Sequence, residues 1–148
     1  LGLFVFALVC RGWRKAQLKV GGPLRTRVHS DVIMPGRVAL VKWALAEGCP
    51  RDDRSEGPWT MTSAAAGFGH KELVQYLIPG QGFAMDENVM IWAARSGNLE
   101  LVRWLRGEGC DWDATTCEYA AAAGGGLEVL QWLRANGCPW DAGTCKFA

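Results

Sequence analysis

The sequence predicts an all-α protein, an α-solenoid of stacked helix-turn-helix repeats with short loops. Three observations lead to this prediction: a segment that recurs at a constant step along the chain, apolar residues at helical spacing in each copy, and glycines where the helices should end. The chain has 148 residues and is 49% hydrophobic, which is enough to form a core. That composition and a formal net charge of +1 argue against a disordered chain and against a generally basic nucleic-acid-binding protein.

The repeat is clearest in a segment that begins with glycine. The copies GHKELVQYL, GNLELVRWL and GGLEVLQWL begin at Gly69, Gly97 and Gly125, a constant step of 28 along the chain, and an earlier copy begins at Gly36. Further positions keep the same step: Cys110 and Cys138, Cys117 and Cys145, Trp112 and Trp140, Asp113 and Asp141, and the alanine pairs that begin at Ala65, Ala93 and Ala121. So many coinciding positions exclude chance, and the units are therefore copies of one structural motif.

Each unit is predicted to consist of two short helices. In the last complete unit the first helix runs from Thr116, as its N-cap, to about Ala123. After a glycine turn, the second helix runs from Leu127 to about Asn136. One unit cannot bury its apolar stripe alone, so neighbouring units must stack. The large aromatic residues of the second helices are expected in the core between stacked helices; they are Trp43, Tyr76, Trp104 and Trp132.

Glycines mark the ends of the second helices. Gly48, Gly109 and Gly137 stand where a helix C-cap needs a left-handed residue. The unit that begins at residue 59 has lost this glycine, because Gln81 stands in its place, and it carries Pro79 near the helix end. We therefore expect this helix to end less stably than the others.

The distribution of charge divides the chain into two parts. Residues 1–30 contain six basic residues and no acidic residue, whereas the rest contains ten basic and 15 acidic residues. We expect an N-terminal helical part at residues 1–26 and a repeat array at residues 27–148. The array should contain units at about 27–58, 59–86, 87–114 and 115–142 and a truncated unit at 143–148. Because the chain begins at Leu1 and stops within a unit, we interpret it as a fragment of a longer protein.

Residues 60–70, TMTSAAAGFGH, and the second helix that follows them resemble an ankyrin repeat. The family pattern has Thr, an Ala-Ala pair and Gly-His at these places, and the resemblance covers roughly residues 27–148. Cys117 and Cys145 replace the family's proline, nothing matches its Leu-His, and the period of 28 is shorter than the usual one of about 33. The missing residues fall where the family forms a projecting β-hairpin. We therefore expect short loops after the later units and one longer loop near Asp52 to Ser55.

The resemblance implies a non-enzymatic scaffold that binds a protein partner on the concave face of the solenoid. The family binds through positions that differ from unit to unit among otherwise constant positions. In this chain such positions follow the alanine pairs. The predicted partner-binding residues are Phe68, Arg95 and Ser96, followed by Met90, Trp112 and Glu118. Trp112 and Trp140 allow two interpretations, a loop packed on its neighbour or an exposed aromatic ridge of the kind found in binding hot spots.

Residues 1–26 allow three interpretations. The segment from Leu8 to Trp13, LVCRGW, resembles the end of an F-box, which would make the chain the substrate-recognition part of a ubiquitin-ligase subunit. A helix that caps the open end of the solenoid is the simpler alternative. The ten-residue apolar run before Arg11 is too short to cross a bilayer but would fit the end of a membrane helix. For this chain itself we expect no membrane association.

The six cysteines allow a zinc interpretation. Structural zinc sites take ligand pairs about two to four residues apart, whereas six residues separate Cys110 from Cys117. We therefore expect no metal site. Buried, reduced thiols are the alternative, and disulfides are disfavoured in a cytoplasmic solenoid.

No residues form a pattern typical of an enzyme. His29 and His70 have no recognisable catalytic partners, and the glycine run from Gly124 to Gly126 follows no predicted strand, so it is a turn and no phosphate loop. We expect no catalytic residue and no cofactor. The acidic remainder of the chain also disfavours nucleic-acid binding by residues 1–30. The expected protein is an intracellular, cytoplasmic monomer with a protein partner.

Overall fold

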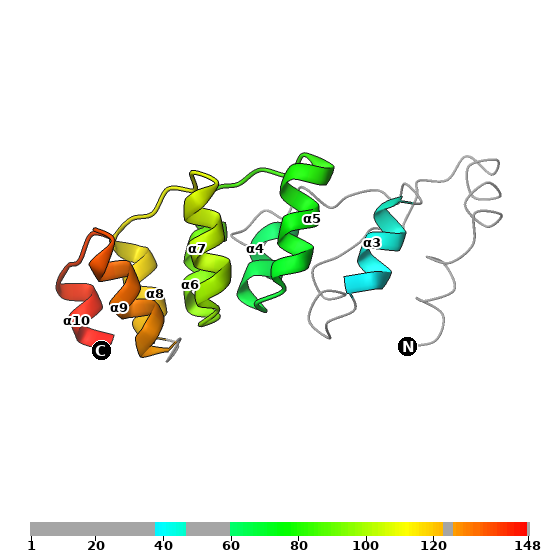
Figure 1. The fold of residues 1–148 in the computed structure, drawn as a ribbon. Helices are drawn as coiled ribbons and strands as arrows, with labels where there is room; N and C mark the ends of the chain where they lie inside the picture. The colour runs from blue at the N-terminus through cyan, green and yellow to red at the C-terminus, as the bar shows by residue number, and fades with distance from the viewer. Residues whose placement is uncertain (1–37, 47–59, 123–125, 148) are drawn as a thin grey trace, which may run out of the picture.

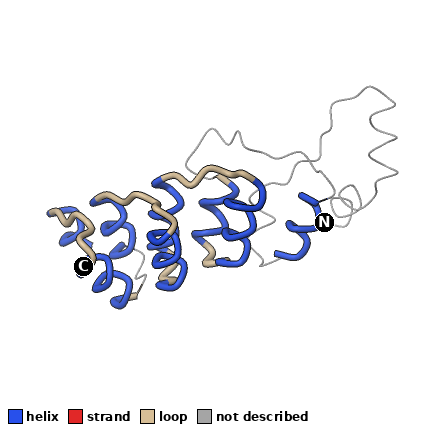
Figure 2. Tube along the Cα trace, turned by 45° about the horizontal axis from the view of Figure 1, so that its top comes forward, coloured by secondary structure: helices blue, strands red, loops and turns tan. Residues whose placement is uncertain are grey.

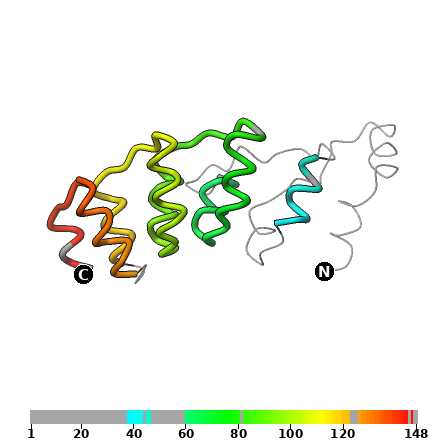
Figure 3. Tube along the Cα trace, in the orientation of Figure 1, coloured from blue at the N-terminus to red at the C-terminus, as the bar shows by residue number. Residues whose placement is uncertain are grey.

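The computed structural model describes residues 38–46, 60–122 and 126–147. This part of the chain contains eight helices and no strand, which confirms the predicted all-α solenoid. The helices form one elongated row, with the residues at 38–46 near one end and those at 142–147 at the other (Figure 1, Figure 3). The N-terminal part at residues 1–26, the glycine at position 48 and the longer loop near residues 52–55 lie outside the described residues.

The helices alternate between two layers. They are α3 (Val38–Ala46), α4 (Met61–Gly67), α5 (Lys71–Gln81), α6 (Glu87–Arg95), α7 (Leu99–Gly107), α8 (Ala114–Ala122), α9 (Leu127–Ala135) and α10 (Ala142–Phe147). The first helices of successive units pack against one another in the order α4, α6, α8 and α10, and we call this layer the first-helix row. The second-helix row consists of α3, α5, α7 and α9, and each of α5, α7 and α9 packs on the first helix of its own unit. The connections between units run along one edge of the array (Figure 2).

Two helices of the first-helix row, α4 and α6, are buried on almost every side. In α4 every residue from Met61 to Ala66 is buried, and in α6 every residue from Val89 to Ala94 is buried. A helix that is enclosed between two neighbouring first helices and its own second helix needs small side chains where the backbones approach. The alanine pairs supply them, with Ala65, Ala66, Ala93 and Ala94 fully buried and Ala121 8% exposed.

The second-helix row is amphipathic. In α7 the buried residues are Leu101, Val102 and Leu105, while Arg103 and Arg106 are exposed. The equivalent stripes bury Leu73, Val74 and Leu77 in α5 and Val129 and Leu133 in α9. One face of each second helix therefore covers the first-helix row and the opposite face meets solvent.

The prediction that the second-helix aromatic residues form the core is wrong. Tyr76, Trp104 and Trp132 are half-buried and pack on the margin of the core, and Trp43 is 38% exposed. Successive residues of an α-helix are turned by about 100°, which places Trp104 roughly 100° from the middle of the buried stripe of α7. These aromatic residues therefore cover the edge of the core and leave its centre to leucine and valine.

The first helices begin with a repeated cap. Asp86, Asp113 and Asp141 each accept a hydrogen bond, at 3.1 Å, from the backbone N–H three residues further on, and Thr60 does the same for α4. The prediction of Thr116 as the N-cap is therefore wrong, because this residue lies fully buried in the first turn of α8 and donates its N–H to Asp113. An aspartate caps a helix as well as a threonine does, so α8 begins two residues earlier than predicted.

Left-handed glycines end the second helices, as predicted for Gly109 (φ 89°) and Gly137 (φ 82°). The prediction that the unit at 59–86 has lost its glycine is wrong. Helix α5 has 11 residues where α7 has nine, continues past Pro79, and ends at Gly82 with φ 68°. The additional length moves the capping glycine along the chain, and the N–H of Gly82 bonds to the carbonyl oxygen of Leu77.

Candidate interaction surface

Trp92 is the centre of an aromatic cluster on the first-helix row. The guanidinium carbon of Arg95 lies 4.9 Å from the centre of the Trp92 ring, which is a cation–π contact within one helix. Tyr119 of α8 meets the same ring edge-on, with the two ring centres 5.9 Å apart. On the other side Trp92 faces α4, where a Cβ added at Gly67 would lie 3.5 Å from the indole. The indole therefore connects three successive units.

Two large side chains project from this row into solvent. Phe68, which follows α4 and lies near the ring of His70, is 40% exposed, and Tyr119 is 39% exposed, whereas Trp92 is only 8% exposed. Arg95 is also exposed. We call Phe68, Trp92, Arg95 and Tyr119 the first-helix surface. Aromatic residues and arginine on a well-packed support are the residue types that dominate protein-binding hot spots.

Of the predicted contact residues, Ser96 caps the C-terminal end of α6 and Glu118 lies in the middle of α8. The hydroxyl of Ser96 donates to the carbonyl oxygen of Ala93 at 2.7 Å and accepts from the N–H of Asn98 at 3.3 Å, so it stabilises the α6–α7 turn. Glu118 is half-buried on α8 and lies against the backbone of Gly143 in α10. Both residues therefore have structural contacts within the array.

The prediction that Met90 contacts a partner is wrong. Its side chain is fully buried in the core, so it is not part of the surface that a partner can reach. The sequence placed it among the variable positions of the first helix, but in α6 these positions are enclosed by α4, α8 and α7. The reason is that a first helix between two units has almost no exposed face.

The predicted contact residue Trp112 belongs to the other row. It meets Trp132 of α9 edge-on, with ring centres 5.8 Å apart, and Arg106 of α7 lies 4.2 Å from its ring centre. Arg103 lies 5.9 Å from the ring of Trp132, and we call these four residues the second-helix surface. The contact with Trp132 favours the interpretation in which the loop packs on its neighbour. Trp140, its equivalent one unit later, is 37% exposed beside Arg134.

The sequence predicted Phe68 and Arg95 but missed Trp92 and Tyr119. A signal for Trp92 was present, because its equivalents in the preceding and following units are Ala64 and Ala120. A large aromatic residue in a column of alanines must either displace a neighbour or reach the surface. Here Gly67 provides the space for it in the preceding unit.

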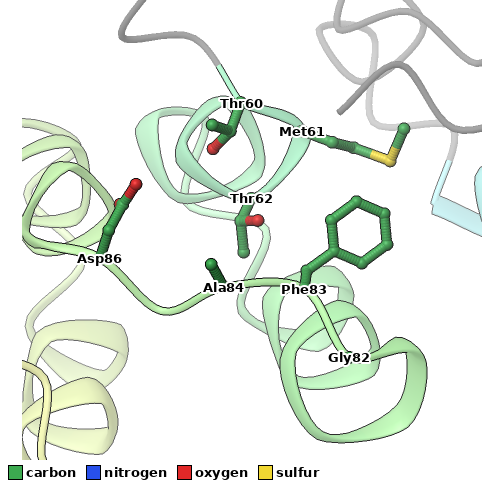
Figure 4. Close-up of a pocket in the computed structure, with 7 residues that line it drawn as sticks. All are labelled: Thr60, Met61, Thr62, Gly82, Phe83, Ala84 and Asp86. Carbon is green, nitrogen blue, oxygen red and sulfur yellow. The ribbon is translucent and has the colours of Figure 1, made fainter. Parts of the chain in front are cut away.

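A separate pocket of about 230 Å³ lies at the start of α4, beneath the connection between α5 and α6 (Figure 4). Its lining consists of Thr60, Met61, Thr62, Gly82, Phe83, Ala84 and Asp86. Phe83 and Met61 lie on one side of it and Asp86 on the other (Figure 4). The carboxylate of Asp86 already caps α6 through the N–H of Val89. The polar side chains among the described residues that line this pocket are those of Thr60, Thr62 and Asp86, and no histidine, cysteine or lysine is among them.

Cys110, Cys117 and Cys138 are buried. Burial raises the pKa of the Cys110 thiol to about 11, with smaller contributions from the charges of Asp86 and Asp111. Across the described ranges, no three His, Cys, Asp or Glu side chains are grouped so that they could hold a metal ion. None of the helices in the same ranges combines the length and the apolar character needed to span a membrane.

The comparison with known families identifies the repeat. The model of the ankyrin repeats, in three copies, matches residues 31–116. The match covers more than half of the chain, so the chain belongs to the ankyrin-repeat family. A search of curated proteins finds no match. Beyond the matched residues, α8 and α9 keep the packing of the preceding units.

Ankyrin repeats are protein–protein interaction modules, and proteins built from them are generally non-enzymatic scaffolds. The chain is therefore an interaction module of this family.

Proposed function

We propose that this chain binds a protein partner through the first-helix surface, on the face that the family resemblance makes concave. The observation that carries the proposal is the cluster of Trp92 with the exposed Arg95 and Tyr119, beside which Phe68 is exposed on the same, mostly buried, row of helices. Ser96 and Glu118 flank this surface. In this proposal the chain acts as a cytoplasmic monomer, so that the surface is open to the partner.

The packing of the cluster favours binding for a physical reason. Trp92 is held between α4 and α8, and Arg95 is stacked on its ring, so both side chains are already ordered before a partner arrives. Ordering a flexible side chain at an interface costs about 0.5–1.5 kcal/mol, and a pre-ordered side chain avoids much of this cost. A stacked guanidinium also keeps N–H groups that can donate to carboxylates or backbone carbonyls of the partner.

The test is quantitative affinity capture with the purified chain and matched variants. Arg95→Glu and Phe68→Ala change the first-helix surface, whereas Arg134→Glu and Trp140→Ala make the same kinds of change beside the second-helix row. Loss of a hot-spot residue costs about 2 kcal/mol, which corresponds to roughly 30-fold in affinity. We expect Arg95→Glu and Phe68→Ala to lose the same captured protein, and the two control variants to retain it.

Circular dichroism shows whether each variant keeps its helices. Capture that stays unchanged in Arg95→Glu and Phe68→Ala would contradict the proposal. So would capture that is lost equally in the two controls, because binding would then not depend on the first-helix surface.

A further inference from the structure

Two cysteine sulfurs are in contact within the unit formed by α8 and α9. Cys117 lies in the first turn of α8 and Cys138 lies just after the end of α9, and their Sγ atoms are 3.1 Å apart. Both side chains are buried, with exposed fractions of 0% and 5%. The Cys138 thiol also donates to the backbone carbonyl oxygen of Asp113 at 3.4 Å. The two ends of one helical hairpin therefore meet at a pair of thiols.

The preceding unit contains the same arrangement with one sulfur fewer. Cys110 is the equivalent of Cys138, and its thiol donates to the carbonyl oxygen of Asp86 at 3.4 Å, as Cys138 does to that of Asp113. The equivalent of Cys117 in that unit is Val89, which is fully buried. The repeat fold is therefore compatible with valine at this place, and packing alone does not require a second thiol.

The contact also makes the two thiols chemically unequal. In the resting pair the Cys117 thiol donates to the Cys138 sulfur. Once Cys117 is deprotonated, its thiolate can accept a hydrogen bond from Cys138, and this lowers the pKa of Cys117 below its ordinary value, against the opposing effect of burial. The same hydrogen bond, together with burial, raises the pKa of Cys138. Since the thiolate is the reactive form, Cys117 is the thiol that reacts first with an oxidant.

We propose that Cys117 and Cys138 form a reversible disulfide bond when the protein meets a peroxide. The Cys117 thiolate attacks one oxygen of hydrogen peroxide, the O–O bond breaks, and a sulfenic acid forms with release of hydroxide, which takes up a proton. The sulfur of Cys138 then attacks the Cys117 sulfur and forms the S–S bond, the S–O bond breaks, and the hydroxyl group takes up the proton of Cys138 and leaves as water. In total, two thiols are oxidised to a disulfide and one peroxide is reduced to two water molecules.

This bond would tie the start of α8 to the turn after α9. It closes a loop of about 20 residues, which restricts the unfolded chain and stabilises the folded unit. The two sulfurs are already in contact, so the bond requires little rearrangement of the folded chain. The expected effect is a rise of about 10 °C in the melting midpoint of the oxidised protein relative to the reduced protein.

The experiment uses the full chain, treated with hydrogen peroxide, alkylated, and digested without reduction. Mass spectrometry should identify a peptide pair joined through Cys117 and Cys138, and dithiothreitol should release it. Melting curves of the oxidised and reduced protein then measure the stabilisation.

Three variants separate the pair from the other cysteines. Cys117→Val, which copies the residue of the preceding unit, should fold and lose both the cross-link and the melting shift, whereas Cys110→Ala should keep both. Val89→Cys should gain a second peroxide-dependent disulfide, with Cys110. The proposal is overturned if oxidation joins other cysteines instead, if Cys117→Val keeps the melting shift, or if Val89→Cys gains no bond.

Discussion

The two rows of helices bury their residues in different ways. Helix α6 of the first-helix row is buried at every position from Val89 to Ala94, whereas α7 beside it buries only a stripe of leucine and valine. Helix α6 has neighbours on both sides along the array as well as its own second helix, so large and small residues alike are buried in it. A second helix keeps one face in solvent and carries arginine and half-buried tryptophan there. The exposed binding residues proposed for the first row therefore lie outside the buried run of α6.

The largest expected loss of stability distinguishes the buried leucine and valine stripe of a second helix from the partly exposed aromatic residue beside it. Leu105→Ala removes a fully buried side chain and should lower the free energy of unfolding by about 2–5 kcal/mol. Trp104→Ala removes a larger but partly exposed side chain, and we expect a loss of about 1.5–2.5 kcal/mol, roughly half of the about 3–5 kcal/mol that full burial would give. Urea unfolding followed by circular dichroism measures both values. A larger loss for Trp104→Ala than for Leu105→Ala would show that the aromatic residues of the second helices belong to the core.

The next effect tests the close packing of the first row. Ala94 is fully buried in α6, whereas its equivalent in the following unit, Ala122, is exposed at the end of α8. Ala94→Leu should destabilise the protein by about 1–3 kcal/mol, because additional methylene groups do not fit a packed core. Ala122→Leu is the matched control and should change stability by less than about 0.5 kcal/mol. Equal effects of the two substitutions in thermal or urea unfolding would show that α6 is not enclosed.

The smallest effect concerns the caps of the first row. Asp86→Ala removes the side chain that accepts from the N–H of Val89, and we expect a loss of about 1 kcal/mol. Glu87→Ala removes an equal charge from the first residue of α6, next to the N-cap, and should have a smaller effect. The comparison by urea unfolding therefore separates capping from charge. If both variants lose the same amount, the charge at the helix start would explain the effect without the cap.

The period of the sequence predicted the fold well because each unit repeats both the helices and their contacts. It failed for Trp104 and its equivalents, because a period identifies equivalent positions but not how far each is turned from the core. It failed for Met90 for a related reason. Helix α6 buries six consecutive residues and has no polar face between Val89 and Ala94, so its sequence does not reveal which positions a partner could reach.

The contact between Cys117 and Cys138 could not be found from the period. The repeat aligns Cys110 with Cys138 and Cys117 with Cys145, so it groups cysteines that stand in equivalent places of different units. The contact instead joins two non-equivalent positions of the same unit, which are 21 residues apart along the chain. Only the three-dimensional closure of the α8–α9 hairpin brings these positions together.

Hydroxyl-radical footprinting with mass spectrometry tests the difference between the rows most directly, because it measures the exposure of individual side chains. We predict that Met90 and Trp92 are strongly protected relative to the unfolded chain, although methionine and tryptophan react readily. Phe68, Tyr119 and Trp140 should be modified at rates much closer to those in the unfolded chain, in line with their exposure of 37–40%. Modification of Met90 and Trp92 at unfolded-chain rates, with Phe68 and Tyr119 protected, would contradict both the enclosed first-helix row and the surface on it.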